Sequence, residues 1–177
     1  MMQGVVGAKM KLAVAATMAA GAMALSGCGS NSLVQNGYVA ARYDGTTVTN
    51  DQVQDALIDV RKVNAEFDSQ SAAVFLALNP QLSKLAGKYG VATSAAQAKA
   101  AFPATVKNPS TSAISVVQSS MDFQALRSSQ QGQPALANLI NTADVQLNPR
   151  YGTWQKGVGP TSVAPNWISA SPAPAAS

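Results

Sequence analysis

Segments with the pattern of β-strands lie only near the two ends of the central part of this chain, and this limits its possible folds. At one end, the alternating residues 38–43, the turn pair Asp44-Gly45 and residues 46–49 predict a β-hairpin. At the other end, residues 144–147 predict a further strand. A strand without a neighbour leaves its backbone N–H and C=O groups unpaired. We therefore expect the hairpin and the segment 145–151 to pair in one small antiparallel sheet.

Between these strands the apolar residues have the spacing of helices. Thr49 and Gln52 match a capping box at the start of a helix over residues 50–67. Residues 72–78 predict a second helix that stops before Pro80, because the residue preceding a proline avoids the α region. The predicted fold class is therefore mainly α (α+β), a helical domain closed by the small sheet. We expect its further helices over residues 80–89, 94–102, 114–126 and 134–140.

The only cysteine, Cys28, follows an N-terminus that is typical of a secretory signal. Lys9 and Lys11 precede an apolar run over residues 12–25, which is shorter than the about twenty residues that a membrane-spanning helix needs. Such a run is typical of a signal peptide, and small residues precede the cysteine. The pattern predicts a bacterial lipoprotein signal cleaved between Gly27 and Cys28. The Cys28 sulfur would then carry diacylglycerol and its amine an acyl chain.

This signal predicts where the rest of the chain lies. The mature protein would face the extracytoplasmic side of the cell membrane, held to the lipid bilayer by its acyl chains. One chain gives only marginal binding, and a second makes the anchor stable. We expect a signal peptide over residues 1–27, a flexible tether over 28–37, a folded domain over 38–156 and a disordered tail rich in Pro, Ala and Ser over 157–177. Trp167 and Ile168 in the tail either dock on the domain or stay free.

The residue content excludes several kinds of catalytic site. The chain has no histidine, and its one cysteine is assigned to lipid, which removes His-dependent triads, Cys nucleophiles and the usual zinc sites. No glycine-rich phosphate loop lies between a strand and a helix. Asp51, Asp55 and Asp59 recur every four residues, a spacing that is more typical of a solvated helix face than of a cation site. We expect no enzyme activity, no cofactor and no metal site.

The net charge of +4 does not indicate a nucleic-acid partner. Two of the twelve lysine and arginine residues lie in the predicted signal peptide, which leaves ten against eight aspartate and glutamate residues. No run of basic residues occurs in the remaining chain. We therefore expect no binding to nucleic acid.

Large apolar side chains are the remaining candidates for a binding surface. Aromatic and methionine side chains adapt to varied partners, as a groove for unfolded polypeptide segments requires. The alternative is that each of them fills the core. The candidate groove residues are Phe75, Tyr89, Phe102, Met121 and Phe123.

Three stretches of the chain resemble the N-terminal domain of the SurA family. VAARYDGTTVTNDQVQDAL, residues 39–57, is similar to the family's opening hairpin and capped helix. KYGVATSAAQAKAAF, residues 88–102, resembles the following turn and capped helix. VQLNPRYGTW, residues 145–154, is similar to the strand that ends the actinobacterial lipoprotein branch of these proteins.

The resemblance implies a fold and a function. The family comprises extracytoplasmic chaperones and peptidyl-prolyl isomerases, mainly helical with paired terminal strands. Isomerase activity in the family belongs to a separate parvulin domain, for which this chain offers neither room nor histidine. The resemblance therefore implies chaperone-like binding of unfolded or exported polypeptides without isomerase activity. The open alternatives are an accessory lipoprotein subunit that docks on one specific cell-envelope partner and a small-ligand receptor of a transport system.

Overall fold

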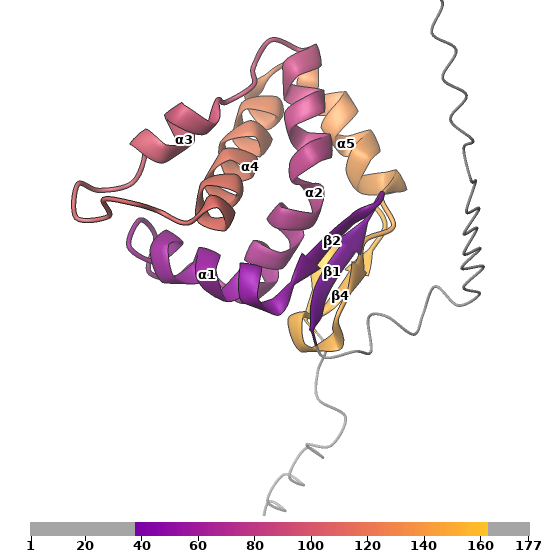
Figure 1. Ribbon diagram of the computed structural model, residues 1–177. Coiled ribbons are helices and arrows are strands. Elements are labelled where there is room, and N and C mark those ends of the chain that lie inside the picture. Colours follow the sequence, from indigo (N-terminus) through magenta and orange to yellow (C-terminus); the bar gives the residue numbers. More distant parts are fainter. Residues whose placement is uncertain (1–37, 163–177) are drawn as a thin grey trace, which may run out of the picture.

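The computed structural model describes residues 38–162, which form five α-helices and two small antiparallel sheets. The helices pack together and the sheets lie at one side of them (Figure 1). This confirms a mainly α fold with small antiparallel sheets. The predicted cleavage site, Cys28, Trp167 and Ile168 lie outside the described residues. The elements are α1 (Asn50–Val60), α2 (Ser69–Lys88), α3 (Ala95–Ala100), α4 (Thr111–Ser128), α5 (Gly132–Thr142), β1 (Val39–Tyr43), β2 (Thr46–Thr49), β3 (Gln146–Leu147), β4 (Thr153–Gln155), β5 (Gly159–Thr161) and the 3-10 helix η1 (Pro149–Tyr151).

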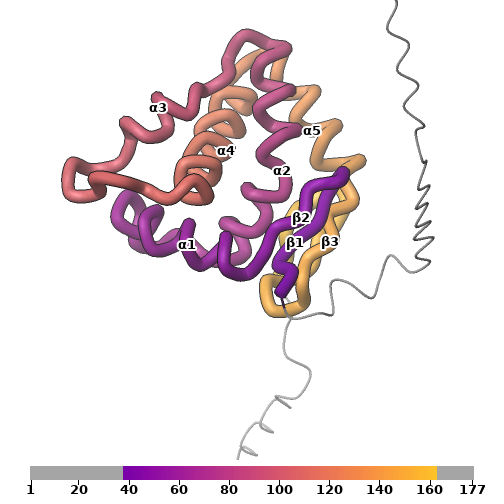
Figure 2. The backbone as a smooth tube through the Cα atoms, in the orientation of Figure 1, coloured from indigo at the N-terminus to yellow at the C-terminus, as the bar shows by residue number. Residues whose placement is uncertain are grey.

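The first sheet joins the two ends of the described chain. Strand β1 lies between β2 and β3, and both pairings are antiparallel. The β1–β2 turn contains Gly45 with a φ of 79°, a conformation that glycine adopts readily. Ala41 pairs with Leu147, so the hairpin and the segment 145–151 meet in one sheet, as the unpaired strands predict. Figure 2 shows β1 and β3 side by side, although they lie at opposite ends of the described chain.

The second sheet, β4 with β5, was not predicted. The indole N–H of Trp154 donates to the carbonyl oxygen of Ala143 at 2.8 Å, and the backbone N–H of Gly157 donates to that of Ile140 at 3.2 Å. These bonds attach the hairpin to the end of α5. The prediction of a disordered tail from residue 157 is therefore wrong for residues 157–162, and 163–177 lie outside the described residues. The turn of this hairpin contains Gly157 with a φ of 80°, a conformation that favours glycine. Because glycine is also common in disordered tails, the composition of this segment did not distinguish a turn from a tail.

The first helix ends at Val60 and not at residue 67 as predicted. Val53, Leu57 and Val60 lie on its buried side, but Val63 is exposed and does not continue that side. The backbone N–H of Val63 bonds to the carbonyl oxygen of Val60, which makes a tight turn at this point. Phe67 lies beyond this turn and packs on the core from a loop.

The second helix runs through Pro80, where the sequence predicted a break. A proline inside a helix removes one backbone hydrogen bond and destabilises the helix. Pro80 faces solvent, however, whereas Ala77, Leu78 and Leu82 around it are buried. A helix that ended at residue 79 would lose this continuous apolar side. Tertiary packing therefore outweighs the local preference, and the predicted segments 72–78 and 80–89 form one helix.

The contact between α2 and α4 contains a buried polar network. The side-chain amide of Asn79 donates to Ser119 Oγ at 2.8 Å. The hydroxyl of Ser83 donates to the fully buried carboxylate of Asp122 at 2.9 Å. Asp122 also accepts the backbone N–H of Thr93 at 2.6 Å, which holds the loop before α3. Buried polar groups are costly unless they are hydrogen-bonded, so this network sets how the two helices align.

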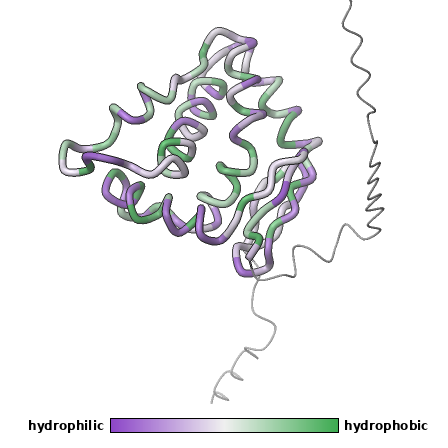
Figure 3. The backbone as a smooth tube through the Cα atoms, in the orientation of Figure 1, coloured by the Kyte–Doolittle hydropathy of each residue, from purple (hydrophilic) through white to green (hydrophobic). Residues whose placement is uncertain are grey.

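The core lies between α1, α2 and α4 and extends to the first sheet. Hydrophobic and hydrophilic residues alternate along these helices (Figure 3), as expected for helices with one buried face. The predicted capping box of Thr49 with Gln52 is present, and a second one, Ser94 with Gln97, starts α3. The large apolar side chains that are almost fully buried include Val48, Val53, Leu82, Val116 and Leu126.

Asp59, near the end of α1, is buried and fixes the start of α4. Its carboxylate accepts the backbone N–H of Ser110 at 2.9 Å and the ammonium of Lys62 at 3.1 Å. Ser110 in turn caps α4, because its Oγ accepts the backbone N–H of Ala113. The bond from Ser110 is the largest cause that lowers the pKa of Asp59 below its ordinary value of 3.8. Burial opposes this shift and Lys62 adds to it.

This geometry predicts a pH dependence of stability. A carboxylate with a lower pKa in the folded state stabilises the fold above its unfolded pKa, and this stability is lost as the pH falls through the folded pKa. Asp59→Asn should lower the free energy of unfolding by about 1–2 kcal/mol at about pH 6. The difference from the parent chain should vanish as the pH falls below the folded pKa. Urea unfolding at a series of pH values measures both effects.

Asp55→Asn is the matched control for this experiment. Asp55 lies one turn earlier on α1, its side chain is exposed, and only its backbone carbonyl contacts Ser110. This variant should keep the pH profile of the parent chain. A difference between Asp59→Asn and the parent that did not change with pH would contradict the assigned role of Asp59.

Gln70 joins the C-terminal part of the fold to α2. Its side-chain amide donates to the carbonyl oxygens of Tyr151 at 2.7 Å and Thr161 at 3.1 Å. Gly152 lies against this amide with a φ of 107°. A Cβ atom at Gly152 would overlap the Gln70 amide and crowd the Thr161 carbonyl. This close approach therefore requires glycine at position 152.

Gly152→Ala should lower the free energy of unfolding by about 3 kcal/mol, through backbone strain and loss of the Gln70 hydrogen bonds. Gly87→Ala is the control, because an added Cβ in α2 would meet no atom within 4 Å. Alanine is the better helix former, so that change should be neutral or stabilise by up to about 1 kcal/mol. Urea unfolding followed by circular dichroism compares them. A Gly152→Ala protein as stable as its parent would refute this contact.

Candidate functional site

An apolar cleft of about 200 Å³ opens between α2, α4, α5 and the β4–β5 hairpin. We call it the apolar cleft. Val74, Leu78 and Leu82 line it from α2, and Leu136 and Ile140 line it from α5. The lining residues with polar side-chain groups are Ser71 and Trp154, and both groups are already hydrogen-bonded, the Ser71 hydroxyl to the Asp68 carboxylate at 3.1 Å and the Trp154 indole N–H to the Ala143 carbonyl oxygen. The cleft can therefore bind apolar groups by excluding water, but it has few groups to orient a polar ligand.

Two phenylalanines form one wall of the apolar cleft. The rings of Phe75 and Phe123 meet edge to face with their centroids 6.0 Å apart. Phe67 stacks on Phe75, with the ring centroids 6.3 Å apart. Both wall residues are half-buried, so part of each ring stays open to solvent. Aromatic pairs in this geometry stabilise each other and hold the wall in place.

The β4–β5 hairpin forms the opposite side of the cleft. Trp154 is half-buried against the end of α5, whereas the side chain of Val158 is 69% exposed at the mouth. This side was not predicted, because Val158 lies in the segment expected to be a disordered tail and no role was expected for Trp154. The signal in the sequence for this hairpin is Trp154, because a large aromatic side chain usually packs against other parts of the fold.

The five predicted groove residues do not form one surface. Phe75 and Phe123 lie together in the wall of the apolar cleft. Tyr89 lines a separate groove. Phe102 is 8% exposed and belongs to the core, whereas Met121 is 38% exposed and lines neither hollow. Spacing along α4 places residues 121 and 123 on different sides of the helix, with buried Asp122 between them.

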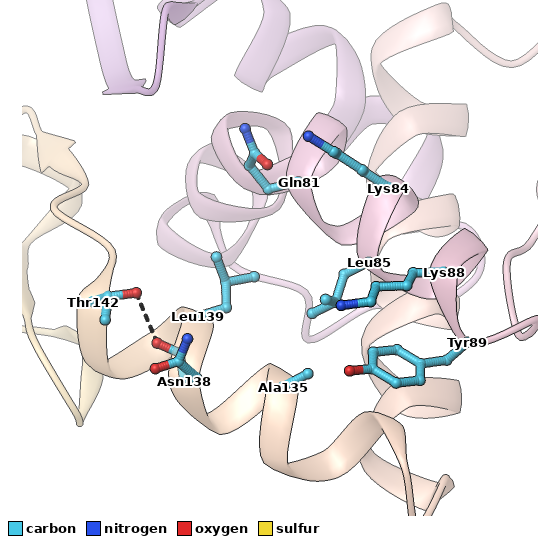
Figure 4. A pocket seen from close by; sticks show the side chains of 9 residues that line it. All are labelled: Gln81, Lys84, Leu85, Lys88, Tyr89, Ala135, Asn138, Leu139 and Thr142. Carbon is cyan, nitrogen blue, oxygen red and sulfur yellow. Dashed lines mark hydrogen bonds between the residues drawn. The ribbon is translucent and has the colours of Figure 1, made fainter.

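The separate groove lies between α2 and α5 and has a volume of about 650 Å³. We call it the α2–α5 groove. Figure 4 shows Lys88 and Tyr89 extending from α2 toward α5, with Ala135 opposite. Leu139 lines both this groove and the apolar cleft, so the two hollows are neighbours on α5. The groove differs from the cleft in its charge, because Lys84 and Lys88 both lie on it.

Ionisable groups within residues 38–162 form no recognisable catalytic arrangement. No group of three or more acidic, histidine or cysteine side chains there is placed to hold a metal ion. The ion pair in this part of the chain is Lys62 with Asp59. Burial, with the neighbouring charge of Asp44, raises the pKa of Tyr43, which keeps that phenol neutral. No helix in the described part is both long and apolar enough to cross a membrane.

Comparison of the chain with protein-family models, with curated proteins and with solved structures gives no match. The functional interpretation therefore depends on the site itself and on the sequence resemblance.

Proposed function

We propose that this protein is a membrane-anchored, extracytoplasmic lipoprotein that holds unfolded or exported polypeptide segments, without isomerase activity. The observation that carries the proposal is the apolar cleft, a hollow lined by aliphatic and aromatic side chains at the surface of a helical domain. Such a site binds by burying apolar side chains of a passing chain and shows little sequence discrimination.

The size of the cleft supports a polypeptide client over a small ligand. Sites for small organic molecules usually enclose about 300–1,000 Å³, and the apolar cleft has about 200 Å³. That space fits one or two side chains of a longer chain. Fully burying one large apolar side chain contributes about 1.5–3 kcal/mol, which gives weak and reversible holding. Weak holding suits a chaperone-like protein, because its clients must be released.

The resemblance to the SurA N-terminal domain supports the same proposal. Its opening and closing stretches correspond to the strands β1 and β3, which pair in one sheet. The chain contains no histidine of the kind common in parvulin sites, so the proposed activity is holding and not proline isomerisation.

The proposed anchor is Cys28, supported by the small residues before it and the basic, apolar N-terminus. Two acyl chains would hold the domain at the membrane surface without help from its own surface residues. Exported chains emerge at that surface, so the anchor would raise the local concentration of the domain around its clients.

Val158→Glu tests the apolar cleft. A carboxylate at the mouth would have to lose its hydration when an apolar client binds, and this desolvation weakens binding. Because Val158 is exposed, the substitution should leave the fold intact. The full chain in lipid nanodiscs should slow the aggregation of an unfolded client followed by light scattering. Val158→Glu should reduce that effect at least about threefold, the loss of roughly 0.7 kcal/mol of binding.

Ile58→Glu is the matched control, because Ile58 on α1 is 63% exposed and does not line the cleft. It should protect the client as well as the parent chain does. The proposal fails if the parent chain has no effect at several-fold molar excess over the client. It also fails if both glutamate variants behave alike.

Cys28→Ser tests the anchor. Without the thiol no thioether to diacylglycerol can form, so the chain should leave the membrane fraction or remain as an uncleaved precursor. Fractionation and intact-mass measurement distinguish the parent from the variant. Ala65→Ser, a change at an exposed position of the folded part, controls for expression. Unchanged mass and membrane retention of the Cys28→Ser protein would rule out lipidation at this residue.

A further inference from the structure

We infer that the α2–α5 groove binds an extended polypeptide segment that carries carboxylate side chains next to an apolar residue. This goes beyond the proposed function, because the groove is separate from the apolar cleft and has a different chemistry. The inference does not require that the cleft binds anything.

Charge is the first observation behind this inference. Lys84 and Lys88 lie one turn apart on α2, on the same side of the helix, and both are exposed. No acidic residue lines the groove, and neither lysine forms an ion pair within residues 38–162. The carboxylate of Asp44 accepts a hydrogen bond from Gln81 but does not line the groove. The groove therefore presents two lysine ammonium groups that form no ion pair with another residue of the described chain.

The floor of the groove is the second observation. Leu85, Ala135 and Leu139 are half-buried there and offer an apolar surface. Lys88 lies with its ammonium 5.6 Å from the centre of the Tyr89 ring. That ring helps to hold the charge beside the apolar floor without neutralising it. A ligand that fits must have an apolar part and a negative part close together.

The rim supplies groups that suit a peptide backbone. The side-chain amide of Asn138 is exposed and has both donors and an acceptor, as a peptide unit does. The hydroxyl of Thr142 donates to the backbone carbonyl oxygen of Asn138 at 2.8 Å, which holds the Thr142 side chain against α5. An extended segment could pair its backbone with the Asn138 amide while its side chains reach the floor and the lysines.

The shape of the groove favours a polypeptide over an anionic membrane surface. The lysines border a hollow of about 650 Å³ between two helices, which a narrow segment can enter and a flat lipid surface cannot fill. A small inorganic anion would leave the apolar floor in water. An acidic segment with one apolar side chain satisfies both parts of the groove.

Three peptides that share a central leucine and a neutral fluorophore test this inference. Glutamate, glutamine or lysine residues flank the leucine, and fluorescence anisotropy measures binding to the purified full chain. Two exposed charge pairs should make the glutamate peptide bind about fivefold more tightly than the glutamine peptide at low salt. The lysine peptide should bind most weakly. The preference should shrink in about 1 M salt, where the screening length is about 3 Å.

The double variant Lys84→Gln with Lys88→Gln should remove the preference and leave binding of the glutamine peptide unchanged. Lys99→Gln is the control, because Lys99 is exposed on α3 and does not line the groove. Val158→Glu should also keep the preference for glutamate, which separates this inference from the apolar cleft. The inference is overturned if the double variant keeps the preference, or if all three peptides bind equally. Binding to anionic vesicles that needs these lysines, without any peptide preference, would also overturn it.

Discussion

The packing of α2 on α4 is the interaction on which the helical core and the wall of the apolar cleft depend. Asn79 and Ser83 on α2 bond to Ser119 and Asp122 on α4, inside a contact that is otherwise apolar. Hydrogen bonds have directions and apolar contacts do not, so this network selects one alignment of the two helices. In that alignment Phe75 of α2 meets Phe123 of α4, which makes the wall of the apolar cleft. A shift of either helix by one turn would leave Asp122 buried without its partners.

The rest of the fold is arranged around α2. Helix α5 lies beside it, so α2 and α5 enclose the groove that holds Lys84 and Lys88. Gln70 near the start of α2 holds the C-terminal hairpin through two carbonyl oxygens. One helix thus positions three parts of the molecule: the polar network, the cleft wall and the hairpin that closes the cleft. This explains why α2 continues through Pro80 in spite of the lost hydrogen bond.

Local signals in the sequence predicted the starts of α1 and α3 closely, but they placed a helix start at Pro80 that the structure does not have. The capping boxes at Thr49 and Ser94 depend on residues three positions apart, and both are present. That the opening hairpin and β3 share one sheet also follows from the sequence, because no other strand was expected beside β3, but the sequence does not show which hairpin strand β3 pairs with. The candidate groove was only partly predictable. The sequence shows that Phe102 and Phe123 are large and apolar. It does not show that Phe102 is buried in the core and that Phe123 borders a cleft. The burial of Asp122 depends on Ser83 and Thr93, which lie far away in the sequence.

If both proposals hold, the apolar cleft and the α2–α5 groove would supply two different kinds of recognition on neighbouring sides of α2 and α5. Apolar burial gives affinity that depends little on sequence, whereas charge gives selectivity and faster association. In the proposed function the apolar cleft would supply the first, and the α2–α5 groove would add a preference for acidic segments. Leu139 borders both, so it marks the place where these two chemistries meet on α5. A protein that used only the cleft would hold any apolar segment. With Lys84 and Lys88 beside an apolar floor, the protein would hold acidic segments longer than neutral ones.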